Sequence, residues 1–409
     1  MKIAIVINDL SVKGGAQRQA VELARELGAK GNKVDIFCMK LNKDVCYPQI
    51  IKSLNVYTPS HNEDKSISLQ DSDNLIIKLI KFVHNLWYQR RANNKLAQLI
   101  NIKNDKSDGY EVINFHDDTV ELAKDFKSFK TVWMMNDLPS GLIDYERDPS
   151  RFTSFIKRLI ISLLKFKYVI SVKNINKIIV LDKRNAHLVK KYFGRKAMVI
   201  RSGVDIRRFD LRDIRQKPTS SHHKILSVNI FFKYRRYEDL IEALNILVNE
   251  KKMRVELDIV GKEDTDPEYT RYIKNLVKDY NIGEYVNFLG VVEESKLLSE
   301  YKKADIFVFP NHNQTWGLSV FEAMLNYCAC VVSKGSGAHE VLKDGENALL
   351  VNPKAPQELA EKIFILLKNN KLRRKIAIQG HDFVIQNLSW SKYSNAMMRQ
   401  FQLAIRQRS

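Results

Sequence analysis

Short apolar runs alternate with segments of helical periodicity along most of the chain. Residues 2–8 form an apolar run, residues 17–29 have the period of a helix that stops at Gly31, and residues 33–39 are apolar again. A strand, a helix and a second strand in this order form a βαβ unit with parallel strands. Further strand-like runs follow, with helical stretches between them, at 111–115, 130–135, 177–181 and 197–200. The pattern predicts a parallel sheet with helices on its faces.

A polar stretch over residues 207–223 breaks this rhythm and predicts a domain boundary, with domains at 1–210 and 211–388. After it the alternation restarts, with strands expected at 224–228, 254–260, 286–289, 305–309, 329–333 and 348–351. We therefore expect an α/β protein of two Rossmann-like domains. In such folds the ligand lies at the carboxyl-end loops of the strands, here in the crevice between the domains.

The chain is strongly basic. Its 409 residues include 67 lysines and arginines against 47 aspartates and glutamates, a formal net charge of +20. An anionic membrane surface, nucleic acid and a phosphate-rich substrate would each account for this excess. Charge alone does not choose among them.

Cysteine usage and the N-terminus indicate the compartment. Cys38, Cys46, Cys328 and Cys330 fit neither a disulfide framework nor a zinc site, so we interpret them as reduced core thiols. The apolar run at the N-terminus has no cleavage site and is too short to span a bilayer. We expect a cytoplasmic protein.

Two segments, residues 74–102 and 151–173, mix large apolar residues with lysine and arginine. Both have the pattern of basic amphipathic helices. Two interpretations stay open for them: their apolar faces pack on the first domain, or they attach the protein to an anionic membrane surface.

The stretch from Pro310 to Met324 carries the most chemistry. A polar loop follows a buried strand and leads into a helix whose first turn contains Gly317, so the amides of Leu318 and Ser319 can approach an anion. A helix N-terminus of this kind can bind a diphosphate. Glu322 lies about five residues into the helix, where its carboxylate can accept hydrogen bonds from two ribose hydroxyls. A capped core helix with a solvent-facing glutamate is the alternative.

The segment from Gln314 to Glu322 resembles family 4 of the glycosyltransferases, and the resemblance extends over nearly the whole chain. That family has two glutamates separated by seven residues, with an aromatic residue, Gly and Leu between them, as Trp316, Gly317 and Leu318 stand here. Glu322 matches the second glutamate, which binds ribose, and Gln314 replaces the first, which addresses the donor sugar. The resemblance implies the GT-B fold, with two Rossmann-like domains facing across a crevice and residues 389–409 crossing back to the first domain as a helix.

In the first domain the family landmarks are a glycine loop and a histidine. Gly14 and Gly15 resemble the family's glycine loop, in which the absence of side chains permits close approach of the backbone to a ligand. The resemblance implies that Gly14 faces the acceptor and that Gly15 faces the donor phosphates. His116, at the end of a strand, is similar to a histidine that lies near the sugar; a structural loop histidine is the alternative. Asn136 and Asp137 end the next strand and are expected to line the acceptor side.

In the second domain, residues 202–205 resemble the family's interdomain hinge, and residues 335–353 resemble its donor-domain pattern. Arg235 matches a lysine of the family, with Lys233 or Arg236 supporting it. Cations are needed at this position because negative charge grows on the leaving nucleoside diphosphate as the glycosidic bond breaks.

The resemblance implies a retaining glycosyltransferase that moves a hexose-type sugar from a nucleotide diphosphate sugar to a glycan or lipid-linked saccharide. We expect front-face attack, no cofactor, no metal ion and no nucleic-acid partner, at the inner face of the cell membrane if the amphipathic helices bind lipid. Three alternatives stay open: an epimerase of the same fold, a phosphorylase of the same fold, and a non-catalytic nucleotide or polyanion binder.

Overall fold

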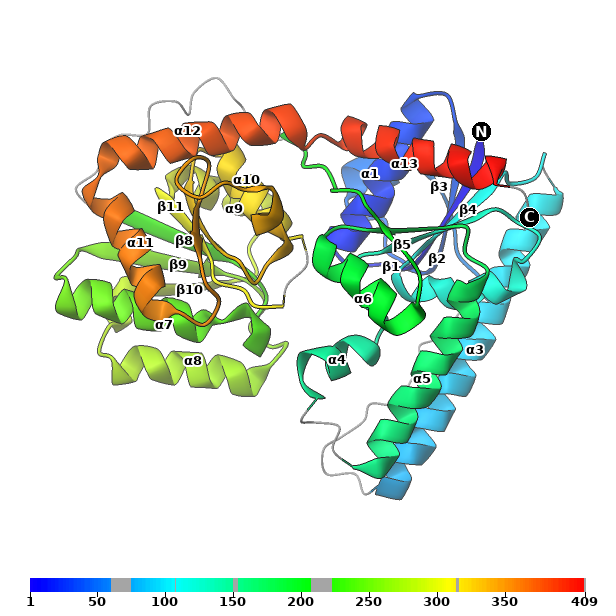
Figure 1. Cartoon of the computed structure of the whole chain (residues 1–409), viewed down its shortest axis with the longest axis horizontal. Coiled ribbons are helices and arrows are strands. Elements are labelled where there is room, and N and C mark those ends of the chain that lie inside the picture. The colour runs from blue at the N-terminus through cyan, green and yellow to red at the C-terminus, as the bar shows by residue number, and fades with distance from the viewer. Residues whose placement is uncertain (60–74, 107, 150–153, 207–222, 314–315, 408–409) are drawn as a thin grey trace. The chain divides into compact units, whose positions relative to one another are not determined.

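The computed structural model describes six stretches of the chain: residues 1–59, 75–106, 108–149, 154–206, 223–313 and 316–407. The chain divides into two units (Figure 1). Unit 1 comprises Met1–Val180, Asn185–Ile200 and Tyr393–Ser409, and unit 2 comprises Leu181–Arg184 and Arg201–Lys392. The chain therefore passes from unit 1 into unit 2 after Ile200, whereas the expected boundary at residue 210 lies outside the described residues.

Unit 1 is built on a seven-stranded parallel sheet with the order β3-β2-β1-β4-β5-β6-β7. Its strands are β1 Lys2–Leu10, β2 Lys33–Leu41, β3 Asn55–Tyr57, β4 Val112–His116, β5 Thr131–Met135, β6 Lys177–Val180 and β7 Met198–Val199. In register, Ile3 of β1 pairs with Val34 of β2 on one side and with Val112 of β4 on the other. All residues of β4 and β5 are buried, as expected for central strands that are covered on both faces.

Helices connect these strands, and one more, α13, follows near residue 400. They are α1 Gly15–Ala29, α2 Pro48–Ile51, α3 Leu75–Asp105, the 3-10 helix η1 Asp117–Asp125, α4 Leu142–Arg147, α5 Phe155–Lys173, α6 Lys183–Phe193, which belongs to unit 1 from Asn185 onward, and α13 Trp390–Arg406. From Tyr393 onward, α13 belongs to unit 1 and lies next to α1 (Figure 1), where Lys30 donates hydrogen bonds to Ser394 (2.5 Å) and Asn395 (2.7 Å). Tyr393, Met397, Phe401 and Ala404 recur every three or four residues of α13 and are all buried.

Unit 2 repeats the plan with a six-stranded parallel sheet of order β10-β9-β8-β11-β12-β13. Its strands are β8 His223–Val228, β9 Val255–Val260, β10 Val286–Gly290, β11 Ile306–Phe309, β12 Ala329–Ser333 and β13 Leu349–Val351. Its α-helices are α7 Tyr237–Asn245, α8 Pro267–Asp279, α9 Glu294–Lys303, α10 Leu318–Leu325, α11 Pro356–Lys368 and α12 Asn370–Asn387. Shorter helical turns are η4 Lys233–Arg235, η5 Ile246–Glu250, η6 Gly283–Tyr285 and η7 Gly337–Val341.

Each unit has its own hydrophobic core between sheet and helices. In unit 1 the core includes the fully buried Phe115 and Trp133; in unit 2 it includes Ile225 and Leu257. Burying one such side chain stabilises a fold by about 1.5–3 kcal/mol. The four cysteines are buried and carry no disulfide, as the sequence predicts. Among the described helices, none is long and apolar enough to cross a membrane.

The strand order places a topological switch point in each sheet. Consecutive strands depart in opposite directions from β1 and β4 in unit 1, and from β8 and β11 in unit 2. Ligands of open parallel sheets bind at the carboxyl ends of the strands at such a point. The loops after these four strands are therefore where a site is sought.

Candidate functional site

The switch point of unit 2 is marked by two asparagines. Asn229 directly follows β8 and Asn311 lies two residues after the end of β11, and their carboxamides are 3.0 Å apart. Gly261, after β9, allows this packing, because a Cβ at that position would lie only 1.6 Å from the Asn229 carbonyl oxygen. Tyr237 holds the same carbonyl with a hydrogen bond of 2.9 Å from its hydroxyl. The two strand ends are thus fixed to one another.

Arg235 lies over this pair, in the 3-10 turn η4. Its Nη1 is 3.0 Å from the Asn311 carboxamide, in the amide orientation that turns the Asn311 oxygen toward it. The guanidinium also stacks on the ring of Tyr234 at 4.8 Å, and the Tyr234 carbonyl accepts a 2.8 Å hydrogen bond from the His312 amide. These contacts place a half-buried cation at the carboxyl edge of the sheet.

The two other cations of this turn differ from each other. Lys233 is exposed. Arg236 adopts a left-handed φ of 56° and pairs with Glu238 at 2.6 Å and Asp239 at 3.0 Å. Burial opposes its charge, but these ion pairs outweigh burial and raise the pKa of Arg236. Arg236 is thus engaged with the first turn of α7, and Lys233 has more freedom to follow a ligand.

The electrostatic surroundings of His312 show that this edge is positive. Its side chain is half-buried, and its Nδ1 is buried without a hydrogen-bond partner. Burial is the main cause that lowers the pKa of His312; the nearby charges of Lys354, Arg236 and Arg184 lower it further, and Asp239 opposes them. Near this imidazole the cations outnumber the acid, which favours an anionic ligand.

Helix α10 begins beside this edge with Gly317 as its N-cap. The φ of Gly317 is 76°, a left-handed value that favours glycine, and a Cβ there would lie 2.9 Å from the Phe309 ring. Leu318 and Ser319 form the first turn and are half-buried. Trp316, 1% exposed, stacks on Phe321 with 4.5 Å between ring centroids and anchors the start of the helix.

Glu322 is the fifth residue of α10, as the sequence predicts, and is partly exposed. The Tyr301 hydroxyl donates to its Oε2 at 3.2 Å. Burial, followed by the Glu322 charge, raises the pKa of Tyr301 well above its usual value, so the tyrosine remains a donor. Gln314, the other predicted residue of this stretch, lies outside the described residues.

In unit 1 the predicted residues meet at the carboxyl ends of β4 and β5. His116 has no exposed surface; its Nε2 lies 3.0 Å from the Asn114 Oδ1, and its Nδ1 has no hydrogen-bond partner. Burial lowers the pKa of His116 to about 3, so its imidazole is neutral at pH 7. A neutral imidazole with one unused nitrogen can donate to or accept from a hydroxyl, but this structure does not expose it.

The acidic residues after His116 brace the loop that follows β5. Asp117, at a left-handed φ of 49°, accepts from the Asn136 amide at 2.9 Å and from its side chain at 3.2 Å. Asp137 pairs with Arg147 at 2.6 Å. Burial raises the pKa of Asp117 to about 7, although the hydrogen bonds from Asn136 oppose this shift. No group of three or more histidine, cysteine, aspartate or glutamate side chains suited to a metal ion occurs within the described residues.

The glycine loop lies at the other strand of this switch point. Gly14 is the N-cap of α1 and Gly15 is its first residue. The Gly14 carbonyl accepts a 3.1 Å hydrogen bond from the Tyr47 hydroxyl. The N-terminus of α1, which has no acidic residue in its first turn, thus stands at the carboxyl edge of β1.

Glu340, within the predicted donor-domain pattern, binds both segments at which the chain enters unit 2, Leu181–Arg184 and the residues from Arg201 onward. Its carboxylate accepts from the Lys183 amide at 2.9 and 3.0 Å and from the Arg201 guanidinium at 2.5 Å. Arg201 in turn covers the Trp316 ring at 5.2 Å. The predicted hinge stretch adds a bridge between Val204 and Ser389.

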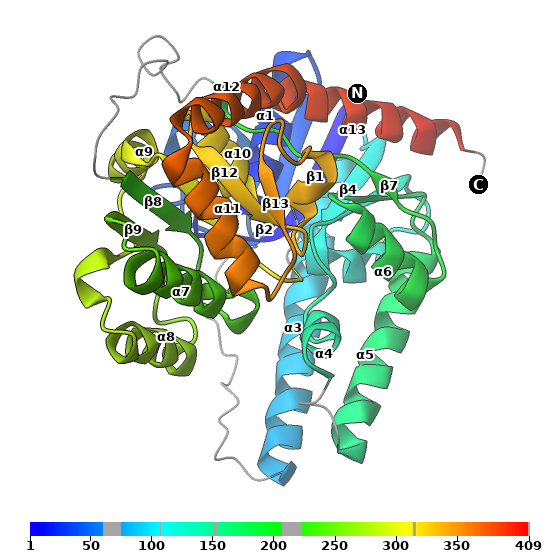
Figure 2. The same ribbon diagram turned by 60° about the vertical axis from the view of Figure 1, so that its left-hand side comes forward.

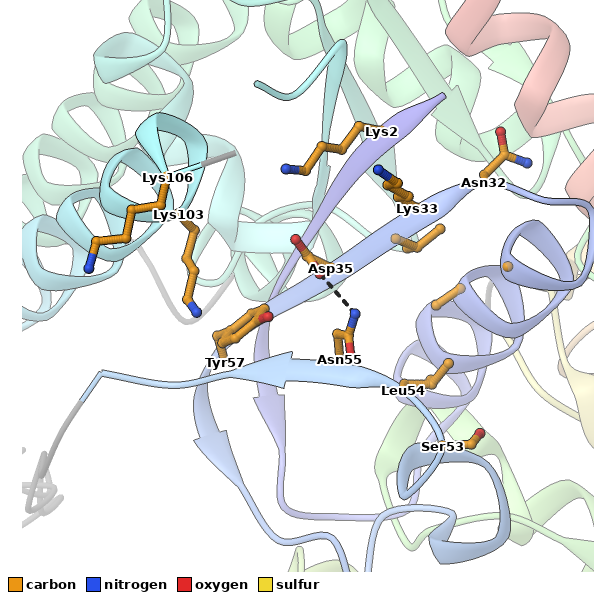
Figure 3. A pocket seen from close by; sticks show the side chains of 13 residues that line it. Lys2, Asn32, Lys33, Asp35, Ser53, Leu54, Asn55, Tyr57, Lys103 and Lys106 are labelled. Atoms are coloured by element: carbon orange, nitrogen blue, oxygen red, sulfur yellow. Dashed lines mark hydrogen bonds between the residues drawn. The ribbon is translucent and has the colours of Figure 1, made fainter. Parts of the chain in front are cut away.

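A cavity of about 570 Å³ lies elsewhere, at the amino-terminal edge of the unit 1 sheet (Figure 3). Several of its lining side chains are already engaged: Asp35 accepts from Asn55 at 3.3 Å, and Lys103 covers the Tyr57 ring at 4.0 Å. Asp35 also accepts from the Tyr110 hydroxyl, outside the cavity, at 2.7 Å. We therefore place the candidate site at the carboxyl ends of the strands, where the switch points and the cations lie, and not in this cavity.

The model of one protein family, glycosyl transferases group 1, matches residues 210–383. The matched residues lie in the part of the chain that forms unit 2, which is therefore similar to that family. An uncharacterized glycosyltransferase of Methanocaldococcus jannaschii is 31% identical over 173 residues, which are 41% of this chain and 42% of that protein. The chain spans about half the length of the curated relatives it matches.

Solved structures match over nearly the whole chain. Sucrose-phosphate synthase from Thermosynechococcus elongatus has a TM-score of 0.71 at 20% identity and covers 98% of each chain. HepE of Anabaena, in complex with UDP-glucose, has a TM-score of 0.69 at 15% identity and covers 98% of this chain and 100% of its own. The predicted GT-B fold of two Rossmann-like units is confirmed.

Sequence analysis missed several residues of this site. Asn229 directly follows a buried strand and Asn311 lies two residues after another, a signal that was present in the pattern. Tyr301 and Arg201 gave no such signal, because each reaches its partner from a distant part of the chain.

Proposed function

We propose that the protein is a retaining glycosyltransferase that moves a hexose from a nucleotide diphosphate sugar to a glycan or lipid-linked saccharide, without a metal ion. The observation that carries the proposal is the positive carboxyl edge of unit 2. There Arg235 lies over the switch-point asparagines, within a domain that matches the group 1 family. A diphosphate is the group that such an edge suits best.

In the proposed reaction the acceptor hydroxyl oxygen forms a bond to the anomeric carbon on the face from which the leaving group departs. The bond between that carbon and the phosphate oxygen breaks, and the hydroxyl proton passes to the departing phosphate. Arg235 and the amides of Leu318 and Ser319 stabilise the charge that grows on the diphosphate. No covalent sugar intermediate is needed.

The donor is assigned to unit 2 and the acceptor to unit 1. Glu322, with one carboxylate oxygen held by Tyr301, is placed to accept from ribose hydroxyls. UDP-glucose is the first donor to test, because HepE binds it. In unit 1 we assign Gly14, Asn136 and Asp137 to the acceptor, while Gly15 and His116 address the donor.

We assign Gln314 to the donor sugar because it stands at the first glutamate position of the family motif, whereas Glu322 stands at the second. Glutamine donates and accepts without a charge, whereas glutamate only accepts. Gln314→Ala should cut catalytic efficiency about tenfold, or 1.4 kcal/mol, and leave binding of the bare nucleotide intact. Gln314→Glu should retain activity; wild-type kinetics in the alanine variant would move sugar recognition elsewhere.

The direct test is a thermal-shift series with UDP, GDP, ADP and their sugars, followed by a transfer assay with the stabilising donor. A ligand at a hundred times its dissociation constant should add about 2.7 kcal/mol of stability. Release of nucleotide diphosphate together with a product of retained configuration supports the proposal. Binding without turnover toward any saccharide or water would leave a nucleotide-binding protein, and no shift with any nucleotide would refute both.

A further inference from the structure

Helix α5 carries apolar side chains on two opposite faces. One face is buried against the core of unit 1 through Ile161, Tyr168 and Val172. The other face forms an outer stripe of large, exposed apolar side chains: Leu159 (48% exposed), Leu163 (56%), Phe166 (65%) and Ile170 (45%). At about 100° per residue, these four positions share one side of the helix. A contiguous exposed apolar stripe marks an interaction surface.

The outer stripe belongs to a helix that is firmly held. Lys167 pairs with the buried Glu121 at 2.6 Å, and the Tyr168 hydroxyl donates to Asp118 at 3.3 Å. Both acidic residues belong to η1, against which α5 packs. The orientation of the stripe is therefore set by the fold of unit 1.

A basic pocket adjoins the stripe. It has a volume of about 260 Å³ and lies between α4, α5 and α6. Its lining includes Arg158, Ser162 and Lys165 from α5, with Tyr145, Lys191 and Tyr192 from the neighbouring helices. Glu146 takes up part of the charge, since it accepts from Lys191 and from the Tyr192 hydroxyl, both at 2.7 Å. Three cations thus face one carboxylate, which leaves the pocket positive.

The charge of the whole helix points the same way. Phe155–Lys173 contains five lysines and arginines and no aspartate or glutamate. Helix α3 extends past the sheet to the same side of unit 1 (Figures 1 and 2) and exposes Ile80 (62%) and Trp87 (56%), with Arg91 over the Trp87 ring at 5.6 Å. Exposed tryptophan and basic residues together suit the interface of a bilayer.

We propose that unit 1 docks on an anionic phospholipid bilayer through the outer stripe of α5, and that the basic pocket binds the phosphate of one anionic headgroup. The stripe lies at the boundary between headgroups and acyl chains. Arg158, Lys165 and Lys191 then meet phosphate at the headgroup level. An apolar stripe beside a phosphate-sized positive hollow is complementary to a lipid with both parts, and this inference does not depend on the transferase reaction.

The test is flotation of the full chain with phosphatidylcholine vesicles, with or without phosphatidylglycerol, at low and high salt. The wild type should float with the anionic vesicles and lose binding as salt rises. Leu163→Ser with Phe166→Ser should abolish flotation. Arg158→Gln with Lys165→Gln should weaken binding to the anionic vesicles about 30-fold, because each cation near such a surface contributes about fivefold.

Matched controls come from unit 2. Ile365→Ser removes an apolar side chain of similar exposure, 42%, and Arg374→Gln with Lys375→Gln removes two exposed charges. Both should float as the wild type does, and melting temperatures establish that every variant is folded. Glycerol phosphate at constant ionic strength separates the two sources of phosphate. It should weaken binding no more than Arg158→Gln with Lys165→Gln does, because the outer stripe still holds the bilayer; complete release would show a site for soluble phosphate esters instead of a bilayer.

Three results would overturn the proposal. The first is no flotation at low salt, and the second is equal binding to neutral and anionic vesicles. The third is self-association in sedimentation that the stripe variant abolishes, because a second copy of the chain would then cover the outer stripe.

Discussion

The carboxyl edges of the two sheets have the same topology but use their polar residues differently. In unit 2 the residues after the strands support a cation, since Asn311 lies beside Arg235, and Lys354, Arg236 and Arg184 lower the pKa of His312. In unit 1 the polar residues at and after the end of β4 bond to neighbouring residues: His116 bonds to Asn114 within the strand, and Asp117 accepts from Asn136. The carboxyl edge of unit 2 therefore suits an anionic ligand, whereas the polar residues at the carboxyl edge of unit 1 mainly stabilise its loops.

The difference shows that a shared fold does not imply a shared role. The family match covers residues 210–383, which lie in unit 2 apart from the undescribed stretch at their start. A diphosphate makes the same demands on every enzyme that uses it. An acceptor can be any of many molecules, so the unit assigned to it has no comparable fixed set of charges.

The largest effect should come from Arg235→Ala, which tests whether the charged edge of unit 2 drives the reaction. Removing one donor of this kind costs about 100- to 1,000-fold in kcat. Substrate affinity should fall less, because the cation acts mainly as charge develops. Steady-state kinetics measure both. Lys233→Ala is the matched control, and a larger loss there than at Arg235 would contradict the assignment.

Next in size is Glu322→Gln, which probes the ribose contact in the same unit. Loss of a charge-assisted hydrogen bond should weaken donor binding by about 1.5–3 kcal/mol, measured by calorimetric titration. Tyr301→Phe removes only the partner hydroxyl and should have a smaller effect. If Glu322→Gln binds the donor as the wild type does, the ribose must be held by another residue.

A smaller effect concerns the scaffold of unit 1 and its pH dependence. The pKa of His116 falls from 6.5 to about 3 on folding, so below pH 6.5 the unfolded state binds a proton that the folded state refuses. Stability from this group is therefore lost as pH falls from 6.5 toward 3, by about 1.4 kcal/mol at pH 5.5.

Calorimetric unfolding of wild type and His116→Gln between pH 7.5 and 5.5 measures this loss as a difference between the two proteins. Asp117, whose pKa is raised to about 7, acts in the opposite direction and is present in both. Equal slopes in the two proteins would mean that His116 is accessible to protons in the folded state.

The smallest expected effect is that of metal removal. We expect activity to survive EDTA, because in the proposed reaction Arg235 and the N-terminus of α10 supply the positive potential at the diphosphate. Complete loss of activity that magnesium or manganese restores would show that a metal ion takes their place.

Much of the fold follows from the periodicity of the sequence. The strands Thr131–Met135 and Ala329–Ser333 were predicted to within one residue, because both are short apolar runs between polar loops. Helix α10 begins at Leu318, one residue after the predicted start at Gly317, which is its N-cap. By contrast, Asn55–Tyr57 was missed, since a three-residue edge strand is too short to show a period.

The candidate site was predicted less completely than the fold. The positions of Glu322 and Arg235 follow from local sequence, but the partners that orient them do not. Tyr301 reaches Glu322 from another helix, and Asn311 meets Arg235 across two strand ends. The burial of His116 depends on the closure of η1 over β4, which no local pattern records.

Unit 1 consists of three chain segments, and this affects the order in which the two units can finish folding during synthesis. All of unit 2 lies before residue 393, so Tyr393–Ser409 of unit 1 is synthesised only after the whole of unit 2. Until then, the surface that Met397 and Phe401 cover is open to water. N-terminal domains usually fold first during synthesis. Here the unit whose synthesis begins first is the one whose folding is completed last.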